Sequence, residues 1–162
     1  MFRPMRRSRQ QLSREECGEI LHRAASGVLA VTGDGGWPYA VPLSYVWHEG
    51  AVYFHGARTG HKLDAIKQDE RVSFCVVDRD EIVPEEYTTY FRSVIVFGRA
   101  KIMDDPAQIR AAIEMLAKKY HPTDTQAHRN HMIDREIVAM CMVKIVPEHI
   151  TGKEAVELRK TR

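Results

Sequence analysis

The sequence is poor in cysteine and has no long hydrophobic run. Cys17, Cys75 and Cys141 lie far apart and form no CxxC pair, so neither a disulfide framework nor a structural zinc site is predicted. Cys75 and Cys141 sit in apolar, strand-like runs, and we expect them to be buried thiols. No apolar stretch approaches the roughly 18 residues that cross a bilayer, and the charged N-terminus lacks the apolar core of a secretory signal. The cytoplasm is therefore the simplest compartment, without a membrane partner.

The sequence also lacks a large excess of charge of either sign, since 24 basic and 22 acidic residues leave a net charge of +2. So small a balance argues neither for nor against nucleic acid. The basic residues are nevertheless concentrated at the start, where five arginines precede the first acid, Glu15. Such an arm can hold nucleic acid or a phosphate, but short arginine runs are weak motifs, and we favour a solvated tail with no nucleic-acid partner. We divide the chain into a basic arm, 1–12, and one domain, 13–158.

Two common catalytic motifs are missing as well. No GxSxG elbow marks a serine hydrolase, and no HExxH marks a zinc enzyme. His121, His128 and His131 have no recognised metal spacing, so we predict no metal site and place them in an exposed loop.

The elements that are present are mostly strands. Ser13 and Glu16 form a capping box for a first helix, and the glycines of 33–36 predict a hairpin turn. We predict strands at 27–32, 37–47, 51–55, 72–78, 93–103 and 138–146, and helices at 13–25, 61–68 and 104–119. Residues 80–88 and 121–130 read as loops, Gly98 as a bulge, and 150–158 as a closing segment. Because strands and helices do not alternate, we expect a closed or split antiparallel β-barrel with flanking helices.

Three segments could bind a ligand. Pro38 and Pro42 interrupt the pairing of one strand, and the unpaired backbone could meet the edge of a flat heterocycle such as a flavin; a plain edge strand protected by proline is the alternative. Residues 54–62, FHGARTGHK, end a strand and open a helix beside three cationic side chains. This arrangement favours an anion, although a solvated loop would look the same. Arg92 enters a strand where a cation could stabilise a reduced flavin, or could simply pack.

These segments together carry a family resemblance. In order along the chain stand PYAVPLSYV, VYFHGARTGHKLDAI, RVSFCVVD, TTYFRSVIVFGRAKIM and ITGKEAVEL. This series resembles the pyridoxamine 5′-phosphate oxidase-like, FMN-binding split-barrel superfamily, and within it the nitroimidazole-resistance proteins. The most specific part is YFHxAxxGHK, at Tyr53 to Lys62. The basic set with which the vitamin oxidase binds pyridoxal phosphate has no residue-by-residue match here.

The resemblance implies a six-stranded split barrel that dimerises, with FMN in two grooves at the interface. We expect His55 beside the reacting part of the cofactor, as the catalytic candidate, and Gly60, His61 and Lys62 at the phosphate. The full expected cofactor-binding set is Val41, Pro42, Leu43, Ser44, Phe54, His55, Gly56, Ala57, Gly60, His61, Lys62 and Arg92.

The implied function is an FMN-dependent oxidoreductase, similar to a nitroreductase. A reduced nicotinamide or similar donor would load the flavin, which passes electrons to a small nitroaromatic such as a 5-nitroimidazole. Two alternatives stay open: a flavin-binding protein without turnover, and a haem-binding relative with a histidine such as His55 or His61 as axial ligand.

Overall fold

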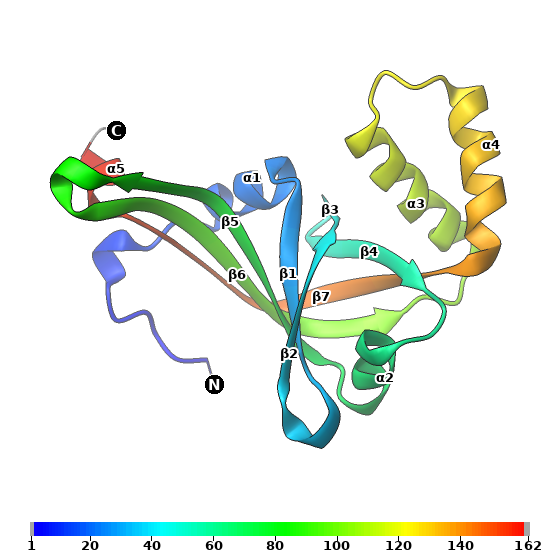
Figure 1. Ribbon diagram of the computed structural model, residues 1–162, viewed down its shortest axis with the longest axis horizontal. Coiled ribbons are helices and arrows are strands. Elements are labelled where there is room, and N and C mark those ends of the chain that lie inside the picture. The colour runs from blue at the N-terminus through cyan, green and yellow to red at the C-terminus, as the bar shows by residue number, and fades with distance from the viewer. Residues whose placement is uncertain (1, 161–162) are drawn as a thin grey trace.

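A computed structural model describes residues 2–160 of the chain (Figure 1). One antiparallel sheet has the strand order β2-β1-β5-β6-β7-β4-β3. Its strands are β1 (Ser26–Thr32), β2 (Pro38–Ser44), β3 (Val46–His48), β4 (Ala51–Ala57), β5 (Arg71–Val83), β6 (Thr88–Ile102) and β7 (Met140–Glu154). The helices are α1 (Arg14–Arg23), α2 (His61–Gln68), α3 (Pro106–Tyr120), α4 (Gln126–Glu136) and α5 (Val156–Lys160), with short 3-10 turns at Ser8–Gln10, Asp34–Gly36, Pro84–Glu86 and Ile137–Ala139.

The sheet coils into a barrel that stays open between its two edge strands, β2 and β3. The predicted split barrel is thereby confirmed, with seven strands instead of six. The difference arises at Tyr45, where the predicted strand 37–47 divides. The Tyr45 N–H donates to the hydroxyl of Tyr120 at 2.9 Å, and its carbonyl accepts from the ammonium of Lys119 at 3.0 Å. Because α3 satisfies these backbone groups, the strand pairing can break there.

Two apolar clusters hold the fold together. Inside the barrel, alternate residues of each strand point inward, as with Leu29 of β1, and α1 and α2 close the barrel ends. The second cluster lies outside the barrel, between the outer side of β4 and the helices α3 and α4, where Tyr53 packs with Leu116 and Ile133. The outer side of β4 is therefore covered at one end by helices instead of solvent.

The predicted loop at 80–88 is wrong, because β5 and β6 continue as a long hairpin in which Ile82 pairs with Thr89. This hairpin extends away from the body of the molecule, opposite α3 and α4 (Figure 1). Strand pairing satisfies backbone groups whatever the polarity of the side chains. Since this extension packs on no core, it needs no apolar alternation that a sequence pattern could reveal.

Two other predictions fail near the C-terminus. Residues 121–130 are not all loop, since α4 begins at Gln126, capped by the Thr125 side chain. Its buried residues are only Arg129 and Ile133, which gave no helical periodicity. The strand predicted to end at 146 continues to Glu154 as β7, with a register shift beside Gly98 that confirms the predicted bulge.

The cysteines and the N-terminal segment complete the comparison. Cys17 is buried, whereas Cys75 and Cys141 are half-buried, so the expectation that both are fully buried is wrong. Gln11 bridges to Lys153 of β7. Among residues 2–160, no helix combines the length and the apolar character that crossing a bilayer requires.

Candidate functional site

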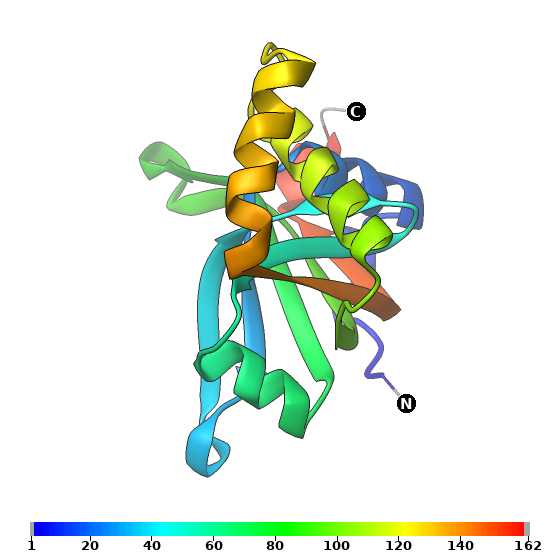
Figure 2. The same cartoon turned by 90° about the vertical axis from the view of Figure 1, so that its right-hand side faces the viewer.

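A cavity of about 610 Å³ lies between the open side of the barrel and the helices α3 and α4. Figure 2 shows these helices side by side over one end of β4, with α2 below them. The barrel contributes Ser44, His55, Gly56 and Ala57 to its wall. The opposite wall comes from α3, α4 and the residues that follow: Ile113, Leu116, Ala117, Tyr120, Met132, Ile133, Glu136, Ala139 and Met140.

The structure thus brings two of the predicted segments together. Ser44 ends β2 and His55 lies near the end of β4, yet both line one cavity. The alternation of β2 turns Pro42 and Ser44 outward, while Val41 and Leu43 pack against the barrel core. Phe54 is fully buried in the same core. Any contact of Val41, Leu43 or Phe54 with a ligand in this groove would therefore come from their backbone.

Lys62 reaches the same place from α2. Its half-buried side chain lies against Gly56, because a Cβ built on Gly56 would be 2.9 Å from the Lys62 Cε and 3.1 Å from its Nζ. Burial, and then the charge of Lys62, lower the pKa of the His55 imidazole from its ordinary 6.5. The lowered pKa favours the uncharged form of the His55 imidazole beside the Lys62 side chain.

The helix start beside Lys62 favours an anion. Gly60 is the N-cap of α2, and its φ of +131° is one that glycine adopts at little cost. The N–H groups of Leu63 and Asp64 donate to the Gly60 carbonyl. His61 and Lys62 are therefore the first two helical residues, and their N–H groups lie at the start of the helix. N–H groups at a helix start, together with the helix dipole, attract negative charge.

The His61 ring is directed elsewhere. It stacks on Tyr39 of β2 with ring centroids 4.2 Å apart, and its Nε2 accepts the Asp34 N–H at 3.3 Å. The imidazole thereby ties α2 to the β1–β2 hairpin. We consequently assign any anion contact of His61 to its backbone N–H.

Arg92 does not join this group within one chain. Its guanidinium pairs with Glu154 at 2.9 Å and with Asp78 at 3.4 Å. Glu154 and Met140 are the two ends of β7, and only Met140 lines the cavity. The predicted place of Arg92 beside the other residues is therefore not seen in the single chain.

The helical wall of the cavity was missed by sequence reasoning. We predict a helix at 104–119, but its sequence does not show what the face that carries Ile113 and Leu116 covers. Met132 and Ile133 stand in a polar helix without periodicity. Only the packing of α3 and α4 across β4 shows that these side chains border a cavity.

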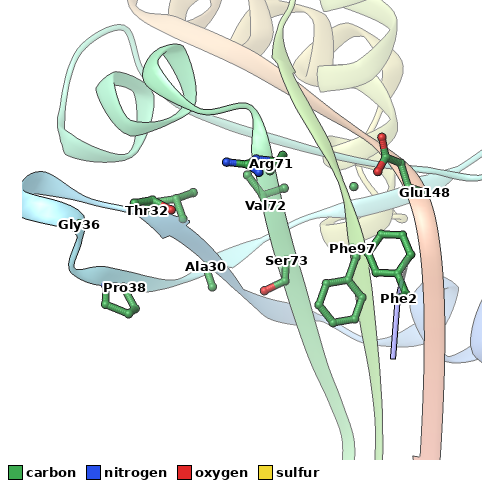
Figure 3. A pocket seen from close by; sticks show the side chains of 12 residues that line it. Phe2, Ala30, Thr32, Gly36, Pro38, Arg71, Val72, Ser73, Phe97 and Glu148 are labelled. Atoms are coloured by element: carbon green, nitrogen blue, oxygen red, sulfur yellow. The ribbon is translucent and has the colours of Figure 1, made fainter. Parts of the chain in front are cut away.

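A second, smaller cavity of about 370 Å³ lies on the outer face of the sheet. In Figure 3, side chains of Ala30, Pro38, Ser73 and Phe97 project from neighbouring strands around it, with Phe2 beside Phe97. Strand pairing continues this face through a central set without charge, the uncharged face: Val28, Ala30, Ala40, Pro42, Ser73, Cys75, Ile95, Phe97 and Thr151. Charged residues border this set, with Arg71 and Glu148 at the cavity and Lys153 beyond Thr151. An outer sheet face in contact with water normally carries polar and charged side chains, so this one is suited to being covered.

The comparisons with known proteins agree with this architecture. The family model described as Pyridoxamine 5′-phosphate oxidase matches residues 13–154, nearly the whole chain. The chain belongs to this family. Comparison with curated proteins gives no significant match.

Solved structures share the fold. A conserved hypothetical protein from Mycobacterium tuberculosis superposes with a TM-score of 0.83 at 21% identity, covering 96% of this chain and 93% of that one. A candidate 5-nitroimidazole antibiotic resistance protein from Bacteroides thetaiotaomicron has a TM-score of 0.75 at 18% identity, covering 89% and 86%. An FAD-binding protein from Mesorhizobium loti has a TM-score of 0.62 at 25% identity, covering 90% and 97%.

Proposed function

We propose that this protein is an FMN-dependent oxidoreductase that reduces small nitroaromatic compounds with electrons from a nicotinamide or similar donor. One observation carries the proposal: the ends of edge strand β2 and of β4 line one cavity, and the Lys62 side chain, from the start of α2, lies against Gly56 of its wall. The first can pair with a heterocycle, the second lines the cavity, and the third attracts a phosphate. FMN has all the matching parts in one molecule.

The donor set fits the phosphate of FMN. Lys62 offers an ammonium, and the start of α2 offers backbone N–H groups. Charge-assisted hydrogen bonds of this kind are about twice as strong as neutral ones. We place the phosphate at Gly60, His61 and Lys62, with the exposed Arg58 nearby in sequence.

The edge of β2 fits the flavin ring. Within residues 2–160, β2 pairs only with β1, so no described strand pairs with the backbone on its other edge. The pyrimidine side of a flavin offers donors and acceptors along one edge, and we assign it to the backbone around Pro42 to Ser44. When bound, FMN would supply the electron-transfer chemistry that side chains lack. His55, as a neutral imidazole, can orient a ligand by hydrogen bonding without adding a charge.

A second copy of the chain would complete the site. The uncharged face includes Pro42, which adjoins Ser44 of the groove, so a molecule covering this face would also border the groove. Burial of an uncharged face is favourable in proportion to the apolar area removed from water. We therefore propose a homodimer with one FMN groove beside the interface in each half.

The visible spectrum of the purified protein tests the cofactor. We expect a yellow protein with flavin absorbance, or a colourless one that takes up added FMN stoichiometrically. Protein that neither contains nor binds FMN would refute the proposal. Light scattering measures the molecular mass and tests the dimer separately. A monomer that binds FMN tightly would refute the proposed dimer but not the proposed cofactor site.

The same preparation distinguishes the two alternatives. Mixing the FMN-loaded protein with NADH or NADPH in a stopped-flow spectrometer should bleach the flavin, and bleaching should reverse when a nitroaromatic is added. A bound flavin that no donor reduces would instead favour a role without turnover. A Soret band on addition of haem, lost in His55→Ala, would favour the haem-binding alternative.

A further inference from the structure

The cavity under α3 and α4 has a composition that restricts what can enter it. Apolar side chains make up most of its wall, with Ile113, Leu116 and Met132 on the helical side. Its lining contains no lysine or arginine among the residues that the structure describes, and Glu136 is its only carboxylate. The volume of about 610 Å³ is that of the whole cavity, which the flavin and an acceptor would share.

This wall is held in place by contacts at the end of α3 and between α3 and α4. The Lys119 ammonium donates to the carbonyl of Ala24 at 2.6 Å, and the Tyr120 hydroxyl donates to the carbonyl of Tyr45 at 2.8 Å. These contacts fix the end of α3 where β2 gives way to β3. On the far side, Arg110 pairs with Asp134 and joins α4 to α3. The apolar wall is therefore a built part of the fold and does not depend on a ligand.

The charges around the cavity are unfavourable to an anion. His55 is neutral at pH 7, since burial and Lys62 lower its pKa. Lys62 belongs to the start of α2, and its ammonium lies by Gly56 of β4. The phosphate of FMN is proposed to neutralise this ammonium. The Arg135 guanidinium lies 3.3 Å from a Glu136 carboxylate oxygen but does not line the cavity. With FMN bound, Glu136 would be the charge that an entering molecule meets.

We infer that the helical side of the cavity, facing the barrel wall that the flavin is proposed to cover, is the acceptor site of the proposed flavoenzyme, and that it takes uncharged, flat, mainly apolar molecules and excludes phosphorylated ones. The role as an acceptor site rests on the proposed function. The selectivity between ligands depends on the residues that line the cavity. It also separates this chain from the substrate that its family is named after, because that substrate carries a phosphate.

A matched pair of ligands tests this selectivity. Pyridoxine and pyridoxine 5′-phosphate differ only by the phosphate, and 2-methyl-5-nitroimidazole serves as an uncharged nitroaromatic probe. Binding is measured by calorimetry on the FMN-loaded protein and on flavin-free protein. We expect the nitroimidazole and pyridoxine to bind, and the phosphate ester to bind the FMN-loaded protein about tenfold more weakly than pyridoxine, a difference of about 1.4 kcal/mol.

Two variants locate the effect in the wall. Glu136→Lys replaces the only carboxylate by a cation and should remove most of the discrimination against the phosphate ester. Met132→Glu places a charge in the apolar wall and should weaken pyridoxine and nitroimidazole binding severalfold. His131→Glu is the matched control, because His131 is exposed on the same helix and does not line the cavity.

The outcomes separate this inference from the proposed function. Equal or tighter binding of the phosphate ester to FMN-loaded protein, unchanged in Glu136→Lys, would overturn the inference while leaving the cofactor in place. Failure to bind FMN would refute the proposed function. In that flavin-free protein, weaker binding of the phosphate ester than of pyridoxine, lost in Glu136→Lys, would still support the inferred selectivity. Equal binding of the two ligands would refute the inferred selectivity. Equal loss of binding in His131→Glu and Met132→Glu would also refute it.

Discussion

The side chain of Lys62 packs against Gly56, so closely that a Cβ added to this glycine would lie 2.9 Å from the lysine Cε. Gly56→Ala should therefore displace the ammonium, because the end of a lysine side chain moves more easily than a strand. We expect FMN affinity to fall by about 1–3 kcal/mol, the scale of one charge-assisted hydrogen bond, as in Lys62→Ala. Fluorescence titration of FMN measures the affinity.

The matched control for that substitution is Gly18→Ala. Gly18 is in the middle of α1, and apart from its chain neighbours and the backbone of that helix, no described atom lies within 4 Å of a Cβ placed there. Alanine favours a helix over glycine by about 1 kcal/mol, so this variant should be slightly more stable and bind FMN normally. An alanine at Gly56 that leaves the dissociation constant unchanged would place the phosphate away from Lys62.

Tyr120→Phe tests the attachment of α3 to the barrel. Its hydroxyl accepts the N–H of buried Tyr45 and donates toward the carbonyls of Tyr45 and Ala25. Removing it leaves a buried backbone N–H without this partner, at a cost of about 1–3 kcal/mol in the free energy of unfolding. Urea denaturation measures the loss. Tyr87→Phe serves as the control, since Tyr87 is 98% exposed and should not change stability.

The titration of His55 tests the electrostatics of the groove. Its pKa is lowered from 6.5, first by burial and then by Lys62. The folded state therefore binds the proton less tightly than the unfolded state, so His55 favours folding above pH 6.5 and this contribution is lost as the pH falls below that value. NMR should show a folded pKa below 6.5 that rises part of the way back in Lys62→Ala. A value unaffected by Lys62→Ala would argue against the contact.

Arg92→Met separates a structural role of this residue from a role at the flavin. Glu154 has no exposed surface and accepts hydrogen bonds from Arg92 and Arg159. Removing one partner of a buried ion pair costs about 3 kcal/mol or more, so urea unfolding should show a clear loss. The folded fraction should bind FMN as the wild type does. A large loss of FMN affinity with unchanged stability would return Arg92 to the cofactor site.

Much of the fold could be predicted from local pattern. The capping box of Ser13 and Glu16 forms as expected, and the prolines at 38 and 42 do lie in an edge strand. These features succeed because each depends on a few neighbouring residues and on backbone chemistry that any context shares. The hairpin extension beyond residue 79 and the helix at 126–136 fail for the opposite reason, since neither has an apolar face of its own to announce it.

The candidate site divides in the same way. The sequence by itself determined the edge strand at Pro42 and the cationic turn that leads into Lys62, because proline chemistry and helix starts are local. Only the tertiary structure decided that Ser44 and His55 share a cavity, that Arg92 pairs with Glu154 at the end of β7 away from this cavity, and that α3 and α4 form an apolar wall. Those relationships depend on how a long sheet coils, which arises from contacts between residues far apart in the chain.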